Sequence, residues 1–145
     1  KISATETIHA EPDRVFGVFS DVENCGDRIE GITGLELLSD TRSGKGVRWR
    51  ETRVFMGKEA IEEMEITAFD APKYYVVEAE SHGTHYTSRY DFEETADGTR
   101  VTWEFEGKPL TFGAKLMSPL GFVFKGSLKK MMAKDVSDLK RYIES

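Results

Sequence analysis

Apolar and polar residues alternate with a period of two through most of the chain, which is typical of half-buried β-strands. One such run covers residues 2–9, and about six more follow between residues 35 and 107, separated by short polar turns. The turn at Asp97-Gly98 is the clearest of these, because an Asp-Gly pair is a strong signal for a hairpin. The sequence therefore predicts an antiparallel sheet of one early strand and about six consecutive later strands.

A helical period follows the first strand. The segment AEPDRVFGVFSDVEN, residues 10–24, has Pro12 where a first helical turn tolerates it, because the missing N–H would be unpaired there anyway. Its apolar residues recur at helical spacing and form one stripe: Val15, Phe16, Phe19 and Val22. We expect a short amphipathic helix here, followed by a second short helix or turn that ends at Gly31 or Gly34.

The end of the chain has the helical period as well. Ser118-Pro119 is a typical helix start, with a capping hydroxyl followed by a proline in the first turn. Apolar residues then recur at steps of three and four: Phe124, Leu128, Met132, Val136, Leu139 and Ile143. The pattern predicts a long helix with one buried face, and this helix is long enough to cover the apolar face of the sheet.

The alternation also shows which strand residues share a face. Charged positions belong to the solvent, so the apolar positions between them face the core. On three strands the inward sets are Tyr86, Ser88, Tyr90 and Phe92; Val101, Trp103 and Phe105; and Met64, Ile66 and Ala68. Ser88 is small and polar among large aromatic residues, and tyrosine hydroxyls in an apolar interior need a hydrogen-bond partner. The polar end of a ligand, or a trapped water, would supply one.

The order of elements resembles the START-like (SRPBCC) superfamily, which includes the polyketide cyclase/dehydrase and lipid-transport family. The resemblance covers essentially the whole chain. It rests on the helix after the first strand, with Ala10, Pro12, Val15-Phe16 and Asp21 at the family's positions, and on the hairpin that joins residues 90–92 to residues 98–103. It implies an α+β helix-grip fold over residues 1–145 as one domain. In this fold a seven-stranded antiparallel sheet wraps a long C-terminal helix, two short helices follow the first strand, and sheet and helix enclose an apolar cavity.

In such a cavity a set of inward residues would bind a ligand. The candidates are Trp49, Met64, Ile66, Val77, Tyr86, Ser88, Tyr90, Trp103, Met117, Phe124 and Leu128. For each apolar residue alone, the alternative is plain core packing. The irregular segment of residues 108–121, which contains Met117, is a candidate lid over the cavity mouth or a surface for a partner or a membrane.

Catalytic candidates are few. Tyr86, Tyr90 and Glu51 would serve if the protein were an enzyme that folds a poly-keto chain. Glu51 shares the parity of Trp49, and so does Arg53, but an exposed strand end is the favoured location for Glu51. A buried glutamate beside an arginine would instead orient a polar ligand or act as a base.

No cofactor or metal is predicted. His82 and His85 lack a third ligand nearby, Cys25 lacks a companion base, and no phosphate loop or dinucleotide motif is present.

Composition narrows the classes of partner. A net charge of −6 over 145 residues argues against nucleic-acid binding. The local basic cluster is interpreted as a solvated strand face and consists of Arg42, Lys45, Arg48, Arg50 and Arg53. No apolar run approaches the roughly 20 residues of a membrane-spanning helix. A single cysteine and the absence of a signal peptide favour a cytoplasmic protein, although transient membrane contact stays open.

Three functions fit these features. The first is binding or transport of a hydrophobic small molecule, such as a lipid, an isoprenoid quinone or a polyketide-like aromatic compound. The second is a polyketide aromatase/cyclase-like enzyme. The third is a protein-interaction module that uses the segment before the last helix. The sequence indicates neither the ligand nor the oligomeric state.

Overall fold

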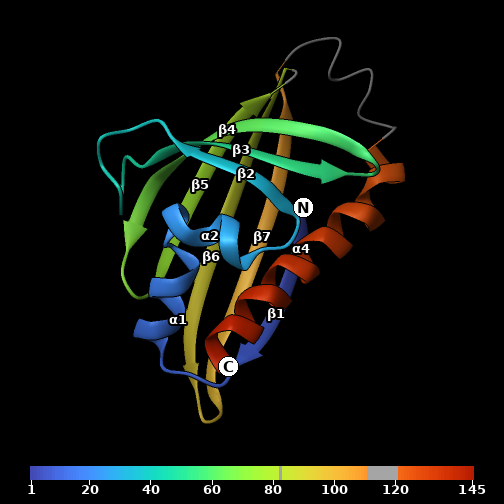
Figure 1. Cartoon of the computed structure of the whole chain (residues 1–145). Coiled ribbons are helices and arrows are strands. Elements are labelled where there is room, and N and C mark those ends of the chain that lie inside the picture. Colours follow the sequence, from blue (N-terminus) through green and yellow to red (C-terminus); the bar gives the residue numbers. More distant parts are fainter. Residues whose placement is uncertain (82, 111–120) are drawn as a thin grey trace.

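The computed structural model describes residues 1–81, 83–110 and 121–145, with side chains from residue 125 onward in the last range (Figure 1). The strands are β1 (Ile2–Ile8), β2 (Ile32–Leu37), β3 (Arg48–Phe55), β4 (Lys58–Asp70), β5 (Tyr74–Ser81), β6 (Thr84–Thr95) and β7 (Gly98–Pro109). The helices are α1 (Pro12–Phe19), α2 (Val22–Arg28) and α4 (Gly121–Glu144).

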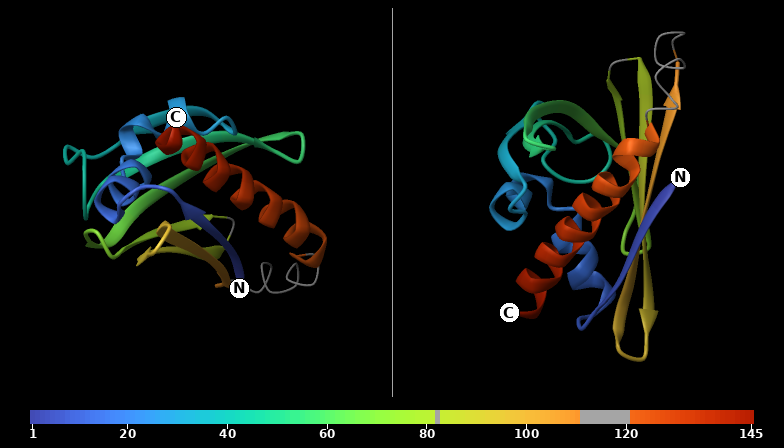
Figure 2. Two further views of the ribbon diagram at one scale, coloured as in Figure 1. Left: turned by 90° about the horizontal axis from the view of Figure 1, so that it is seen from below. Right: turned by 90° about the vertical axis from the view of Figure 1, so that its right-hand side faces the viewer.

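The seven strands form one antiparallel sheet in the order β1-β7-β6-β5-β4-β3-β2. The first strand therefore pairs with the last. All other paired strands, from β2 to β7, are consecutive in the sequence. Figure 2 shows the sheet curving around α4, while α1 and α2 lie toward one end of the space that it encloses. The expectation of a seven-stranded sheet wrapped around a long terminal helix, with two short helices after the first strand, is confirmed.

Helix α1 closes one end of the core because its apolar stripe meets a group of aromatic rings. Pro12 occupies the first turn, and Val15, Phe16, Val18 and Phe19 are buried. The ring of Phe16 packs edge-on against Phe69, Tyr75 and Phe92, with centroid distances of 5.1, 5.6 and 5.0 Å. Such edge-on aromatic contacts stabilise the fold by more than the burial of their apolar surface alone.

Helix α4 lies against the inner face with its predicted stripe. Met132, Val136, Leu139 and Ile143 are buried, and Leu128 packs against the same core. The predicted start of this helix, Ser118-Pro119, lies outside the described residues. Within them no helix is both long and apolar enough to cross a membrane.

Two strand boundaries differ from the sequence expectation. Strand β2 begins at Ile32 rather than residue 35, because Ile32 already pairs with Arg53 across a register shift between Ile32 and Gly34. Strand β7 continues to Pro109, since Lys108 and Pro109 still pair with β6. The prediction that an irregular segment begins at residue 108 is therefore wrong at this boundary, because residues 108 and 109 still belong to β7.

The basic cluster is only partly a solvated strand face. Arg48 and Arg50 do lie on the outer face, where they form ion pairs with Glu65 and Glu63 at 3.5 and 3.2 Å. Arg53 is an exception to this prediction, because it turns inward and its side chain is only 12% exposed.

Gly98 is required by close backbone packing at the β6–β7 turn. It has φ of 139°, and a Cβ there would lie 2.2 Å from the carbonyl oxygen of Ile8. We expect Gly98→Ala to lower the free energy of unfolding by about 3 kcal/mol. Gly17→Ala is the matched control, because Gly17 lies in α1 and a Cβ there meets nothing within 4 Å. That variant should gain about 0.5–1 kcal/mol. Urea unfolding of both measures the difference, and equal effects would contradict the packing argument.

Candidate functional site

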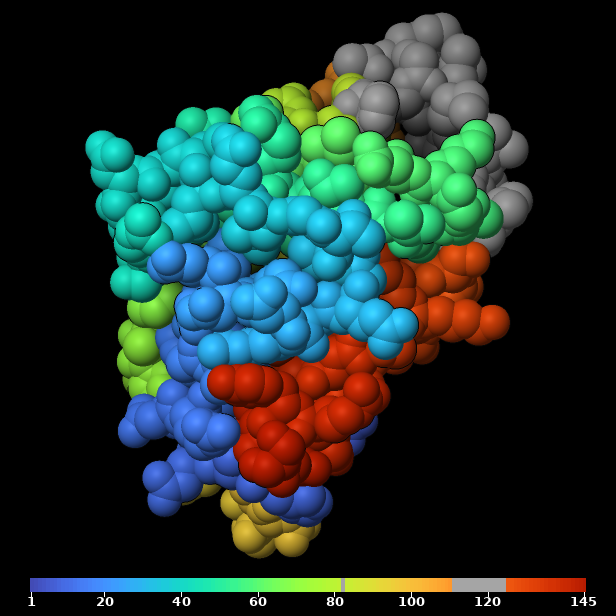
Figure 3. Space-filling view, viewed as in Figure 1, coloured from blue at the N-terminus to red at the C-terminus, as the bar shows by residue number. Residues whose placement is uncertain are grey.

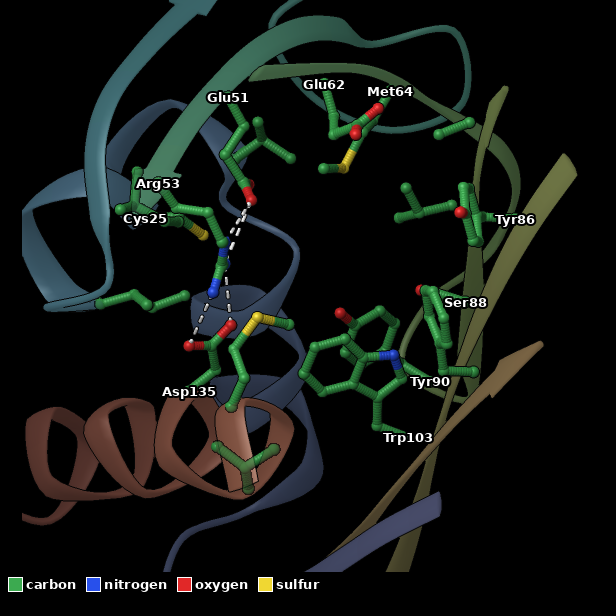
Figure 4. Close-up of a pocket in the computed structure, with 18 of the residues that line it drawn as sticks. Cys25, Glu51, Arg53, Glu62, Met64, Tyr86, Ser88, Tyr90, Trp103 and Asp135 are labelled. Atoms are coloured by element: carbon green, nitrogen blue, oxygen red, sulfur yellow. Dashed lines mark hydrogen bonds and ion pairs between the residues drawn. The ribbon is translucent and has the colours of Figure 1, made fainter. Parts of the chain in front are cut away.

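A cavity of about 470 Å³ lies between the inner face of the sheet and the helices. Figure 4 shows 18 of the residues that line it. The apolar lining comes from the helices, from the residue after α2, and from β2, β3, β4, β5 and β7: Phe19, Val22, Cys25, Ile29, Ile32, Leu35, Trp49, Phe55, Ala60, Met64, Val77, Ala79, Trp103, Phe105, Leu128, Met131, Val136 and Leu139. The polar lining is Glu51, Arg53, Glu62, Tyr75, Tyr86, Ser88, Tyr90, Lys125 and Asp135.

Helices α2 and α4 cover one side of this space. The Glu30 backbone N–H, just after α2, donates a hydrogen bond to Asp138 Oδ2 on α4 at 3.0 Å. Figure 3 shows the two helices side by side on the face that carries α1 and α2. Their contact closes the cavity toward this face.

The structure brings most of the predicted ligand-binding residues together. Eight of them line the cavity: Trp49, Met64, Val77, Tyr86, Ser88, Tyr90, Trp103 and Leu128. Met117 lies outside the described residues, and so does the side chain of Phe124.

The prediction that Ile66 lines the cavity is wrong. Ile66 is fully buried, and it is not part of the cavity lining. Its backbone bonds to the connection before β3, with Gly46 N–H donating to the Ile66 oxygen and Ile66 N–H donating to the Val47 oxygen, both at 2.9 Å. The Ile66 side chain belongs instead to the cluster of buried core residues.

One wall of the cavity is aromatic and comes from β5, β6 and β7. The ring of Tyr90 stacks between Tyr75 and Trp103, with centroid distances of 4.6 and 5.0 Å. Tyr86 stacks on Phe105 at 5.5 Å. Stacking on both faces fixes the Tyr90 ring, so the direction of its hydroxyl is fixed as well.

The hydroxyls of this wall differ in their partners. Tyr75 Oη donates to the Phe19 carbonyl oxygen at 3.1 Å. Within the described part of the chain, the hydroxyls of Tyr86, Ser88 and Tyr90 have no hydrogen bond, and the buried Trp103 Nε1 also lacks a partner. Burial, and then the nearby carboxylates, raise the pKa of Tyr90 well above its ordinary value. The Tyr90 phenol therefore stays protonated and can donate a hydrogen bond.

The opposite wall carries an ionic cluster of Glu51 and Arg53 from β3 and Asp135 from α4 (Figure 4). Arg53 Nε donates to Glu51 Oε2 at 3.1 Å. Its terminal nitrogens Nη1 and Nη2 donate to Asp135 Oδ1 and Oδ2 at 3.3 and 2.9 Å. The second pair is bidentate, which is the geometry that favours arginine over lysine. One guanidinium thus connects the sheet to the helix.

The cluster holds one excess negative charge when both carboxylates are ionised, because they share a single cation. Burial raises the pKa of Asp135 to about 6, although Arg53 opposes the shift, and Glu51 and Asp138 add to it. The two carboxylates hold the Arg53 guanidinium firmly protonated by raising its pKa, against the effect of burial. Asp135 is therefore the member that takes up a proton as the pH falls below neutral.

The expectation that Glu51 lies at an exposed strand end is wrong. Glu51 is only 9% exposed. Strand β3 keeps its alternation without a bulge across residues 48–55, so Trp49, Glu51 and Arg53 all face inward. Alternation along β3 thus places Glu51 inside, and its charge is compensated there by Arg53, two residues further along the same strand.

Asp135 is the member of the ionic cluster that the sequence did not predict as a site residue. Its position carries a signal, because residues 132, 135, 136 and 139 lie on one helical face by the steps of three and four. A carboxylate within an apolar stripe is rare unless it is paired. The helical period therefore indicates a buried partner for Asp135, although it cannot indicate which arginine.

Two other reactive groups do not form a catalytic site. Cys25 lines the cavity, but burial and the neighbouring Asp21 raise the pKa of its thiol to about 12, so it is not a nucleophile near neutral pH. His85 bonds Glu78 through Nε2 at 2.8 Å, and both are partly exposed. Among residues that the structure describes, no group of three or more His, Cys, Asp or Glu side chains is arranged to hold a metal ion.

Comparison with known proteins agrees with this architecture. The family model for polyketide cyclase / dehydrase and lipid transport matches residues 1–144. No curated protein matches the sequence.

Solved structures share the fold at low sequence identity. TTHA0849 from Thermus thermophilus has a TM-score of 0.76 at 21% identity, covering 99% of this chain and 96% of that one. The major latex-like protein 151 from Panax ginseng has a TM-score of 0.80 at 14% identity, covering 99% and 97%. The di-domain ARO/CYC BexL from the BE-7585A biosynthetic pathway has a TM-score of 0.81 at 17% identity, covering 99% of this chain and 50% of that one.

Asp135 should give stability a distinctive pH dependence. Its ordinary pKa of 3.8 applies to the unfolded chain and its folded value is about 6, so the folded state binds more protons between these values. This contribution therefore stabilises the protein at low pH and is lost as the pH rises from about 4 to 6. The free energy of unfolding of the wild type minus that of Asp135→Asn should fall by about 2 kcal/mol from pH 4 to pH 7.

Urea unfolding at several pH values measures this difference. Asp138→Asn is the control on the same helix. Burial opposes ionisation of Asp138, but hydrogen bonds from Lys134 and from the Glu30 backbone outweigh it and lower its pKa. The stability that Asp138 contributes therefore changes only below pH 3.8. The free energy of unfolding of the wild type minus that of Asp138→Asn should stay constant between pH 5 and 7. A flat curve for Asp135→Asn as well would contradict the raised pKa.

Proposed function

Because the chain belongs to the polyketide cyclase/dehydrase and lipid transport family, we propose that it binds a hydrophobic small molecule in the cavity between the sheet and α4. The ligand class is a lipid, an isoprenoid quinone or a polyketide-like aromatic compound. The observation that carries this proposal is the cavity of about 470 Å³, with apolar walls and a few convergent polar groups. This size and this mixture are typical of ligand sites.

Burial of apolar ligand surface supplies the affinity. Each 100 Å² of apolar surface removed from water contributes about 2.5 kcal/mol. The stacked wall of Tyr75, Tyr90 and Trp103 offers flat, rigid surface to an aromatic or conjugated ligand. The hydroxyls of Ser88 and Tyr86 on the same strand supply polar contacts that fix the orientation of the ligand.

A cyclase-like activity is the second candidate, and the Tyr90 phenol favours it. Its hydroxyl is unpaired within the described residues and stays protonated, so it can polarise a ligand carbonyl by donating a hydrogen bond. Glu51 and Asp135 lie across the cavity from it (Figure 4) and could accept a proton. A third function, through the segment before α4, depends on residues 111–120, which lie outside the described residues.

A ring added inside the cavity should abolish binding. Ser88 and Arg89 are adjacent on β6, but Ser88 lines the cavity and Arg89 is exposed on the outer face. We expect Ser88→Phe to weaken binding of the apolar fluorophore N-phenyl-1-naphthylamine at least tenfold, because the new ring occupies ligand space. Arg89→Phe adds the same ring outside and should leave the dissociation constant unchanged. Fluorescence titration measures both, and wild-type binding by Ser88→Phe would exclude this cavity as the site.

Removal of the Tyr90 hydroxyl distinguishes a cyclase from a carrier. Tyr90→Phe keeps the stacking with Tyr75 and Trp103 and loses only the hydroxyl. If the protein is a cyclase, turnover of a poly-keto thioester should fall about 100-fold in this variant while N-phenyl-1-naphthylamine binds as before. If the protein is a carrier, no turnover occurs in either form. Product analysis by mass spectrometry, with the fluorophore titration in parallel, distinguishes these outcomes.

A further inference from the structure

We infer that the cavity selects its ligand by charge: it accepts neutral or cationic molecules whose polar end donates hydrogen bonds to Glu51 and Asp135, and it rejects organic anions. This inference rests on the proposed function, because it concerns the ligand of the same cavity. It follows from how the ionic cluster uses its donors and acceptors.

Arg53 is the cation of the cluster, but three of its five N–H groups already bond the two carboxylates. Nε serves Glu51, and Nη1 and Nη2 serve Asp135. Nη2 also lies 3.1 Å from Glu51 Oε2. A Cβ on Gly31 would lie 3.5 Å from Nη1, so Gly31 lies close to that side of the guanidinium. An arginine in a ligand pocket normally suggests an anionic ligand. Here the two carboxylates occupy the positions that a ligand carboxylate or phosphate would take.

The acceptors, in contrast, have spare capacity. Each carboxylate offers about four lone-pair sites. Among the residues that the structure describes, the one hydrogen-bond contact of Glu51 Oε1 is a long one from Trp49 Nε1, at 3.5 Å. A hydroxyl, amide or amine group of a ligand can therefore donate to this end of the cavity without displacing Arg53. A carbonyl or ether oxygen at the other end of the ligand would meet the hydroxyls of Ser88 and Tyr90 (Figure 4).

The surrounding charges do not reverse the excess negative charge. Glu62 is a further carboxylate in the lining. Asp138 is buried behind Asp135 and is paired with Lys134 and Arg141. Among the described lining residues, Lys125 is the one cation besides Arg53, and it is exposed. It lies ten residues from Asp135, or about 15 Å along α4. An anion that reaches the cluster thus loses its hydration and meets a like charge, while the nearest cation is already held by two carboxylates.

A pair of matched fluorophores tests this selection. N-phenyl-1-naphthylamine is neutral and has an N–H donor, and 8-anilinonaphthalene-1-sulfonate is the same ring system with an added permanent negative charge. The ratio of their dissociation constants is measured for the wild type and for Glu51→Gln and Asp135→Asn. Each substitution makes the cluster neutral, so we expect the sulfonate to gain about tenfold in affinity relative to the neutral probe.

Glu63→Gln is the control, because it removes one negative charge from the outer face of the same sheet, where Glu63 pairs with Arg50. It should leave the ratio unchanged. The inference is overturned if both probes bind and the ratio is the same in all four proteins, or if Glu63→Gln changes it as much as Glu51→Gln does. Failure of both probes to bind the wild type would instead overturn the proposed function. Circular dichroism and the urea midpoint exclude variants that do not fold.

Discussion

The guanidinium of Arg53 is the interaction on which the site depends, because it holds a carboxylate of the sheet and a carboxylate of α4 at the same time. Glu51 and Asp135 are both buried, and Arg53 is the cation that pairs with each of them, at 3.1 and 2.9 Å. Removal of one partner from such a cluster leaves an uncompensated buried charge, which costs several kcal/mol. The cluster therefore fixes where α4 sits above β3, and that spacing contributes to the size of the cavity beside it.

The cavity itself follows from the shape of the fold. The apolar face of a curved seven-stranded sheet has to be covered, and along most of its length one helix covers it. Beyond residue 128, Met132 and Ile143 of α4 pack into the core near β1 and α1, while Val136 and Leu139 are buried where this core borders the cavity. Toward the β3–β4 hairpin the same helix leaves the inner face free, and there Phe55, Ala60 and Lys125 line the cavity. The sheet and helix thus form a core at one end and a ligand-sized space at the other.

Periodicity predicted the strands and helices because burial acts on whole faces, and a face is visible in one sequence; the helix-grip arrangement of these elements came from the family resemblance. The inward set on β6 and β7 follows from alternation alone, and so does the stripe of α4. Ile66 shows the limit, since alternation places a residue on the inner face but cannot show whether the space beyond it is filled. Asp135 shows a second limit. A buried charge is stable only with its partner, and Arg53 and Asp135 are 82 residues apart, so the pairing exists only in three dimensions.

The pKa values also bear on which chemistry the cavity would suit. A general acid or base works best when its pKa lies near the operating pH. Burial moves the pKa of the Tyr90 phenol far above that range, so Tyr90 is suited to donating a hydrogen bond rather than a proton. Burial moves the pKa of Asp135 in the useful direction, to about 6. If the cavity catalyses a cyclisation, Asp135 is thus better suited to move the proton and Tyr90 to polarise the carbonyl. If the protein is a carrier, the same two groups need only orient the ligand, and the raised pKa of Asp135 is then a cost of burying two carboxylates against one arginine.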